Sequence, residues 1–331
     1  CVVARRAVRA DPNERYESVE PFMADIQRCI AGEAIPSYSS TITATIELPS
    51  PSPGSVAVLP FRLLGTDSTT DGYLGLGITD ALITKLSNVG RISVRSTGAV
   101  MKYAGVADPM AAARELGVEH VLEGRIQKLG NRVRVTVQLV RAPSDVPVWA
   151  ASFDEQLEDL LRVEDSISEQ VAQAVAPQLT GEEKEQLAKP GTASAKAHQA
   201  YLRGRFHWSQ GTRDALARAL VAFMQAIAED PDYAQAHAGV ADYYVQLGIH
   251  GGMPPAESFA AAKQSAETAL ERDPNLAEAH ASLGFAMWAY DRDYASAAHQ
   301  FQLAIALNPD YSPAHHWLGL LNSARGRHEM A

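Results

Sequence analysis

The residues that could carry out chemistry in this chain of 331 residues are few and scattered. Gly75-Leu76-Gly77 opens a helical pattern, and glycine-rich turns of this kind can cradle a phosphate with their backbone amides. A dinucleotide-binding turn needs a third glycine where this chain has Asp80, and a short connection to the strand before it. The stretch from Phe61 to Tyr73 is too long for that connection. We therefore expect these glycines to give flexibility at the start of a helix.

His120 could act as a general base, because Glu119 and Glu123 lie beside it in a strand pattern. A lone histidine is nevertheless far more often a packed side chain. The sequence also contains no Gly-x-Ser-x-Gly elbow, no His-Glu-x-x-His pair and no Gly-Lys-Ser/Thr loop. We therefore expect this chain to be non-catalytic, with no metal site and no cofactor of its own.

Two further sets of polar residues invite a chemical role. Three histidines stand at one position of an internal repeat: His237, His280 and His315. They are a whole repeat apart, so we expect them to be structural rather than a metal cluster. Three arginines follow a strand pattern on its polar side: Arg125, Arg132 and Arg134. They could recognise an anion, but charge that prevents pairing between sheets is the simpler explanation.

Composition limits the class of protein. The net charge of −10 argues against a general nucleic-acid surface, which requires a basic patch. Cys1 and Cys29 are the only cysteines, which excludes a disulfide framework and fits a reducing compartment such as the cytoplasm. No stretch is apolar enough for a membrane helix, and no signal peptide opens the chain. The first residue is not Met, which suggests a fragment.

The length predicts two or three domains, and composition divides the chain into five segments. Residues 1–33 have a helical pattern, and residues 34–54 form a linker rich in Pro, Ser and Thr. Residues 55–181 alternate between strand and helix periods, which is typical of an α/β domain. A second linker, 182–195, leads to an all-helical array over residues 196–331. The expected fold class is therefore multidomain, with a short all-α piece, an α/β domain and an all-α solenoid.

The array carries the strongest signal. The lines "DPDYAQAH", "DPNLAEAH" and "NPDYSPAH" recur, and their prolines, Pro231, Pro274 and Pro309, are 43 and 35 residues apart. A period of about 34 residues with a proline closing each unit resembles a tetratricopeptide array. Such hairpins bury their apolar faces only by stacking, so we expect a solenoid. By register, Ala331 falls where the next second helix would begin, so the array is truncated.

The groove of such a solenoid is the usual binding surface for a protein or peptide partner. By register, the first helices present these residues to it: Gln235, Asp242, Gln246, Glu278, Phe285, Trp288 and His316. For Phe285 and Trp288, packing between repeats is the favoured interpretation over partner contact.

The middle segment shows a buried strand, "SVAVLPF", and a hairpin in which apolar and polar residues alternate, "NRVRVTVQLV". Together with "GITDALITKLS" and "ELGVEHVLEGRIQKLG", these lines resemble the TolB-like α/β domain of bacterial regulatory proteins. The turn "GLGITD" departs from the usual Asp-Gly-Leu-like run of that family. The family has no established catalytic residues, so the resemblance implies none here.

The opening segment, "AVRADPNERYESVEPFMADIQRCIAGE", resembles the last two helices of bacterial serine/threonine protein kinases. Asp11, Pro12 and Arg15 match the family pattern, and the resemblance implies that Arg15 pairs with a glutamate upstream. It further implies that ATP and Mg²⁺ belong only to a kinase domain outside this chain. The order of segments then resembles a bacterial kinase followed by a regulatory, partner-binding tail.

Two other classes of protein carry the same tail. One is a transcriptional regulator with an amino-terminal winged helix, and the other is a nucleotide cyclase. A winged helix should end in a β-hairpin with basic residues, whereas residues 1–33 end in an amphipathic helical pattern. This difference favours the kinase.

Overall fold

The computed structural model describes Met23, Gln27 and residues 52–65, 72–105, 108–142, 144–188 and 191–325. The chain divides into two compact units, Cys1–Glu47 and Leu48–Ala331, and the second unit holds all the elements described below. The predictions for Asp11, Pro12, Arg15 and Ala331 lie outside the described residues. Met23 and Gln27 lie in a helix, as expected for this part of residues 1–33.

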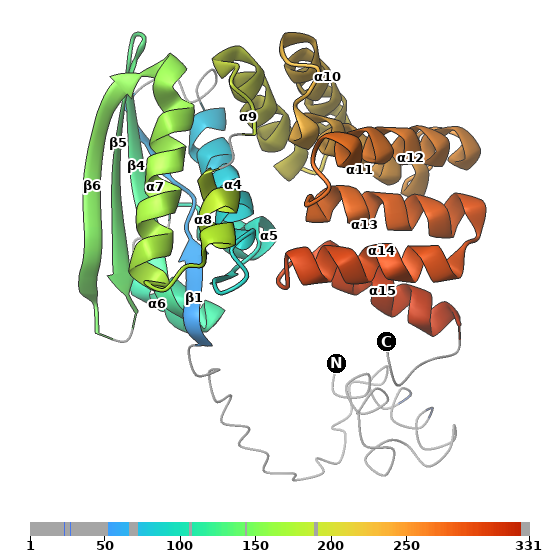
Figure 1. Ribbon diagram of the computed structural model, residues 1–331, viewed down its shortest axis with the longest axis horizontal. Helices are drawn as coiled ribbons and strands as arrows, with labels where there is room; N and C mark the ends of the chain where they lie inside the picture. Colours follow the sequence, from blue (N-terminus) through green and yellow to red (C-terminus); the bar gives the residue numbers. More distant parts are fainter. Residues whose placement is uncertain are drawn as a thin grey trace. The chain divides into compact units, whose positions relative to one another are not determined.

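The α/β half is built on one mixed sheet of six strands (Figure 1). The strands are β1 (Ser52–Val58), β2 (Arg62–Leu64), β3 (Ser93–Val94), β4 (Val118–Leu129), β5 (Arg132–Arg141) and β6 (Val146–Gln156). Their order is β3-β1-β4-β5-β6, and β2 pairs with β4. β1 runs parallel to both β3 and β4, whereas β4, β5 and β6 are antiparallel neighbours. This half therefore begins at Ser52, slightly before the predicted boundary.

The β4–β5 hairpin separates the two faces of the sheet as the alternation predicted. Val133, Val135 and Val137 are buried, whereas Arg132 and Arg134 are exposed. Gly130 turns the chain with φ at +62°, a left-handed conformation that costs glycine little. The predicted hairpin is confirmed.

Helices cover the buried face of this sheet (Figure 1). They include α4 (Tyr73–Ser87) and α7 (Leu160–Val175), and the connections contain α5 (Thr97–Val100), η2 (Met101–Tyr103), α6 (Pro109–Leu116) and η3 (Leu157–Asp159). In α4 the fully buried side chains Leu74, Ile78 and Leu82 recur at helical spacing and face the core. α6 begins at the predicted cap, because the Asp108 carboxylate accepts hydrogen bonds from two backbone amides.

The predicted linker 182–195 is partly wrong, because Gly181–Ala188 forms helix α8. A capping box starts this helix. The Thr180 hydroxyl accepts from the Glu183 amide at 3.1 Å, and the Glu183 carboxylate accepts from the Thr180 amide at 2.8 Å. Leu187 is buried against the core, which attaches the helix to the rest of the unit.

The predicted helical hairpins are confirmed in residues 195–325. They comprise α9 (Ala195–Ser209), α10 (Arg213–Glu229), α11 (Ala234–Ile249), α12 (Pro255–Arg272), α13 (Ala277–Ala286), its π-helical extension η4 (Met287–Asp291), α14 (Tyr294–Leu307) and α15 (Ser312–Ala324). Ser194, Thr212 and Asp293 cap three of these helices through their side chains. The described array is thus three hairpins followed by α15.

Aromatic rings packed on glycines hold the hairpins together. Phe223 on α10 and Phe301 on α14 are fully buried. A Cβ on Gly204 would lie 2.3 Å from the Phe223 ring, and a Cβ on Gly284 would lie 2.9 Å from the Phe301 ring. These positions therefore require glycine, because any side chain would push the two helices apart.

The repeated histidines are structural, as predicted. In each unit the Nε2 atom lies within hydrogen-bond distance of the carbonyl oxygen of the preceding repeat proline. The distances are 2.9 Å for His237, 2.9 Å for His280 and 2.8 Å for His315. Each ring therefore joins the turn between two hairpins to the helix that follows it.

The α/β half and the array form one compact unit, so the expectation of separate domains is only partly confirmed. Helix α4 packs directly on α9. A Cβ on Gly77 would lie 2.9 Å from the Cβ of Leu202, which shows how closely the two helices approach. Leu202 and Tyr201 belong to the same hydrophobic core as the sheet residues.

Replacing Gly204 with alanine should destabilise the unit. The new methyl group overlaps the Phe223 ring, and overpacking of this kind costs about 1–3 kcal/mol. Better helix propensity returns at most about 1 kcal/mol. Gly181→Ala is the matched control, because nothing lies within 4 Å of its added Cβ. Urea denaturation of both variants checks this, and equal stabilities would contradict the packing described.

Candidate functional site

A cavity of about 820 Å³ lies where the α/β half meets the helical array. From the α/β half it is lined by α4 and by residues 94–101. From the array it is lined by the end of α9, by α11 and α13, and by residues 308–317, which include the start of α15. The side of the array formed by the first helices of its hairpins therefore faces the α/β half. We call this space the shared cavity.

A buried ion pair joins the two halves at the shared cavity. Arg205 on α9 places Nε 2.7 Å from the Asp80 carboxylate on α4, and its Nη2 donates to Asp80 at 3.0 Å. Thr97 donates a further hydrogen bond to the same carboxylate at 2.6 Å. Asp80 is only 4% exposed, so its carboxylate is no longer hydrated. The ion pair with Arg205 compensates for this lost hydration.

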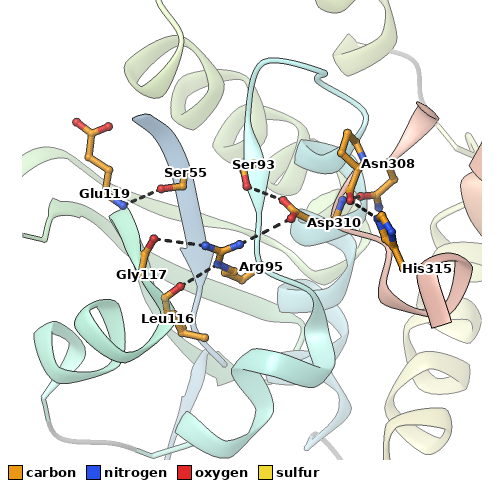
Figure 2. Close-up of polar contacts among 10 residues, drawn as sticks. Ser55, Ser93, Arg95, Leu116, Gly117, Glu119, Asn308, Asp310 and His315 are labelled. Atoms are coloured by element: carbon orange, nitrogen blue, oxygen red, sulfur yellow. Dashed lines mark hydrogen bonds and ion pairs between the residues drawn. The ribbon is translucent and has the colours of Figure 1, made fainter. Parts of the chain in front are cut away.

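A second contact joins the halves at the last repeat (Figure 2). Asp310 accepts a hydrogen bond from the Ser93 hydroxyl at 2.6 Å and lies 3.7 Å from the Arg95 guanidinium. Arg95 also donates to the carbonyl oxygens of Leu116 and Gly117, which fix its position next to the sheet. The turn that carries Asp310 thus lies against the edge strand β3.

A third contact is buried beside α7. His198 on α9 lies with Nε2 2.8 Å from the Glu164 carboxylate, and its Nδ1 lies 3.2 Å from the Tyr233 hydroxyl. All three side chains are buried. Burial raises the pKa of Tyr233, so this hydroxyl stays protonated and can donate or accept. The three contacts together hold α9 and the last repeat against the α/β half.

Two carboxyl groups of the array lie on the shared cavity without a basic partner among the described residues. Asp242 on α11 is 6% exposed and accepts a hydrogen bond from the Ser282 hydroxyl. Glu278 on α13 lies on the same cavity. Burial raises the pKa of Asp242 to about 7, and burial also raises the pKa of Glu278.

The predicted groove residues fall into three groups: those that line the shared cavity, Gln235, and the aromatic pair Phe285 and Trp288. Four of them line the shared cavity: Asp242, Gln246, Glu278 and His316. Gln235 does not line this cavity but packs against Gly191 beside His198, and it lines a smaller hollow together with Asp242 and Glu278. That any of these residues contacts a partner stays a prediction.

Phe285 and Trp288 belong to an aromatic cluster between repeats. The Phe285 ring centroid lies 4.9 Å from that of Trp317, 5.7 Å from that of Phe259 and 5.5 Å from that of Trp288. Packing was the favoured interpretation for both residues, and these contacts fit it. Through Trp317 the cluster supports one wall of the shared cavity.

The remaining candidates from the sequence have structural roles, in packing or in exposed ion pairs. Gly75 lies within α4, and a Cβ there would lie 2.5 Å from the Phe61 carbonyl oxygen, so close packing rather than flexibility requires this glycine. His120 is buried, neither ring nitrogen has a hydrogen-bond partner in the described structure, and burial lowers its pKa. On the open face of the sheet, Arg132 and Arg134 pair with Asp154.

Sequence reasoning missed Asp80, Arg205 and Asp310, which join the halves. Asp80 carried a usable signal, because it is a charged residue on the apolar side of a helical pattern. Asp310 lies in the repeated proline turn, and nothing in its local pattern distinguishes it from the other turns.

None of the described helices is long and apolar enough to cross a membrane.

Comparison with known proteins adds two sequence matches. Residues 52–170 match the family described as "HilA/YgeH-like transcriptional regulator, second domain". "Putative adenylate cyclase 3" of Rhizobium meliloti (strain 1021) is 31% identical over 191 residues, which cover 57% of this chain and 32% of that protein. This chain therefore spans about a third of that relative's length. The family match begins at residue 52, so it does not test the kinase resemblance of residues 1–33.

Three solved structures show weak likenesses. "First TPR of Spaghetti (RPAP3) bound to HSP90 peptide SRMEEVD" is 19% identical, covering 42% of this chain and 99% of that one, with a TM-score of 0.33. "TPR2B-domain:pHsp70-complex of yeast Sti1" is 24% identical, covering 41% and 94%, with a TM-score of 0.29. TolB from Acinetobacter baumannii is 13% identical, covering 40% and 31%, with a TM-score of 0.29. These scores are below 0.5, so the fold rests on the elements described above.

Replacing Arg205 with methionine should strongly destabilise the unit. Removing one partner of a buried ion pair leaves the other charge unpaired, which costs about 3–5 kcal/mol. The double variant Asp80→Asn/Arg205→Met should recover part of this loss. Arg132→Met is the control, because its pair with Asp154 is exposed and should contribute little. Guanidinium denaturation checks the order, and equal losses for Arg205→Met and Arg132→Met would refute it.

Replacing Phe285 with alanine should lower the free energy of unfolding by about 2 kcal/mol or more, because it opens a hole beside Trp317. Gln246→Ala removes a residue of the shared cavity that is not part of the aromatic cluster, so its effect should stay within about 0.5 kcal/mol. Thermal unfolding followed by circular dichroism distinguishes the two. Unchanged stability in Phe285→Ala would contradict this packing role.

Proposed function

We propose that this chain is the regulatory and partner-binding part of a larger bacterial signalling protein. The observation that carries this proposal is the shared cavity, which has walls from both halves of one unit. A ligand or peptide segment in this cavity touches α4 on one side and the first helices of the array on the other. Its binding free energy therefore biases how the two halves are held together.

On this proposal the partner is a protein or a short peptide segment, and the chain works in the cytoplasm. The predicted groove is shared with the α/β half instead of being open along its length. A partner must therefore insert a narrow segment or a side chain to reach Asp242, Gln246 or Glu278. The proposal requires no catalytic residue, metal or cofactor in this chain.

The finer proposal is that the attached domain is a serine/threonine protein kinase. Its support is the resemblance of residues 1–33, with Asp11, Pro12 and Arg15, to the end of a kinase lobe. Partner binding by the array would then raise the local concentration of substrate near the kinase. ATP and Mg²⁺ would be bound only by that domain.

A nucleotide cyclase or a transcriptional regulator is the competing candidate for the attached domain. The relative named adenylate cyclase favours the first, because its match extends over 191 residues of this chain. The family match over residues 52–170 favours the second. All three candidates share the regulatory role of this chain and differ in the domain that it regulates.

The coding DNA upstream of Cys1 distinguishes the candidates. About 300 codons upstream, roughly two domain lengths, should encode a glycine-rich loop, a strand lysine, His-Arg-Asp and Asp-Phe-Gly in that order. A cyclase domain or a winged helix there would contradict the kinase proposal and leave the regulatory one in place.

The regulatory role has its own test in the full-length protein. Deleting the segment that corresponds to residues 52–331 should retain the output activity and abolish its response to partners. An output that is unchanged in both basal level and response would contradict a regulatory function.

A further inference from the structure

The acidic residues that line the shared cavity differ in how their charge is balanced. Four acidic residues line it, Asp80, Asp242, Glu278 and Asp310, against the single arginine Arg205. Asp80 is paired with Arg205, and Asp310 with Ser93 and Arg95. The other two acidic residues, Asp242 and Glu278, have no such ion pair in the described structure.

Among the residues that the structure describes, Asp242 and Glu278 form no ion pair of their own, and Arg205, whose charge lowers the pKa of both, is already paired with Asp80. Within the described part of the chain, no lysine, arginine or histidine lies at ion-pair distance from either group. The Ser282 hydroxyl donates to one oxygen of Asp242, and its other oxygen has no donor among these residues. A carboxylate that is 94% buried, as the 6% exposure of Asp242 implies, is costly to ionise without a partner.

The rest of the lining combines uncharged polar residues and His316 with apolar and aromatic side chains that make up much of its wall. Leu76, Ile83 and Met101 come from the α/β half, and Trp208 and Trp317 come from the array. Indole faces attract cations, and aliphatic walls accept a methylene chain. The volume of about 820 Å³ is within the range of small-molecule sites.

We propose that the shared cavity binds an ammonium or guanidinium group carried on an aliphatic chain, with Asp242 and Glu278 as its counter-charges. The inference rests on the proposed function, because it names the ligand of the same cavity. The group can come from a free amine or from a lysine or arginine side chain of a peptide. Both sources offer the same chemistry to the two carboxylates.

The same geometry affects the protonation of Asp242. Burial raises the pKa of Asp242 to about 7, the Ser282 hydrogen bond and the Arg205 charge lower it, and the Glu278 and Asp80 carboxylates raise it. His316 is a further titratable residue of the lining. Below pH 7 the folded chain therefore holds a proton that an arriving cation must displace. Amine affinity should rise as the pH increases through 7, while an alkylamine itself stays protonated.

The test titrates the whole 331-residue chain with hexylamine, and with hexanol as a neutral ligand of equal length. Calorimetry at pH 6, 7 and 8 measures affinity and proton release. Asp242→Asn should weaken hexylamine binding at least about tenfold and reduce its pH dependence. This variant keeps an acceptor for Ser282, and its thermal unfolding checks the fold. Glu267→Gln, on the exposed side of α12, is the matched control and should bind as the parent does.

A blocked tripeptide with a central lysine distinguishes the two sources. Binding of hexylamine that depends on Asp242 supports a free amine, and binding of the peptide alone with the same dependence supports a basic side chain. If neither hexylamine nor the peptide binds, or if hexanol binds as well as hexylamine, the inference is wrong. It is also wrong if Asp242→Asn leaves amine binding unchanged.

The proposed function can survive that failure. If amines do not bind, but deleting the segment that corresponds to residues 52–331 abolishes the response of the full-length protein, only the cation chemistry is refuted. If the deletion leaves output and response unchanged while hexylamine still binds through Asp242, the regulatory role fails and the binding site remains.

Discussion

The buried ion pair between Asp80 and Arg205 is the interaction on which the arrangement of this unit depends. A carboxylate with 4% exposure is stable as an ion only if a cation approaches it in one defined geometry. Because Asp80 lies on α4 and Arg205 on α9, that geometry fixes the first helix of the array against the sheet. The close approach of Gly77 to Leu202 provides the apolar contact around the pair. Every later hairpin is then placed by stacking on the one before it.

The shared cavity follows from this arrangement. The array touches the α/β half at α9 and again at Asp310, where the last repeat meets Ser93 and Arg95. Between these contacts, α11 and α13 present Asp242 and Glu278 to a space that α4 does not fill. The two carboxyl groups of this space that lack an ion pair among the described residues therefore belong to the array, whereas the contacts between the halves close the space.

Local sequence patterns predicted most of the elements, because helices, hairpins and turns depend on neighbouring residues. The proline spacing located the hairpins, and the alternation in residues 132–139 located the exposed face of the sheet. Helix α8 was missed although Thr180 and Glu183 form a capping box, because its charged residues resemble a linker. The pairing of Asp80 with Arg205 joins residues 125 positions apart, and no local pattern encodes such a pair. Four groove residues were located by register alone, but the α/β half opposite them was not foreseen.

The proline turns of the three units have the same local structure but different neighbours. In the first turn, Asp230 accepts from Thr192, and Arg272 bonds to the Pro231 carbonyl oxygen. In the last turn, Asp310 instead reaches the sheet. These turns differ in the residues beside their prolines and in their distance along the stack from α9. The number of repeats therefore sets the length of the interface between the array and the α/β half. Inserting or removing one hairpin would bring a different turn opposite Ser93 and change the span of the cavity, even if no residue lining it were altered.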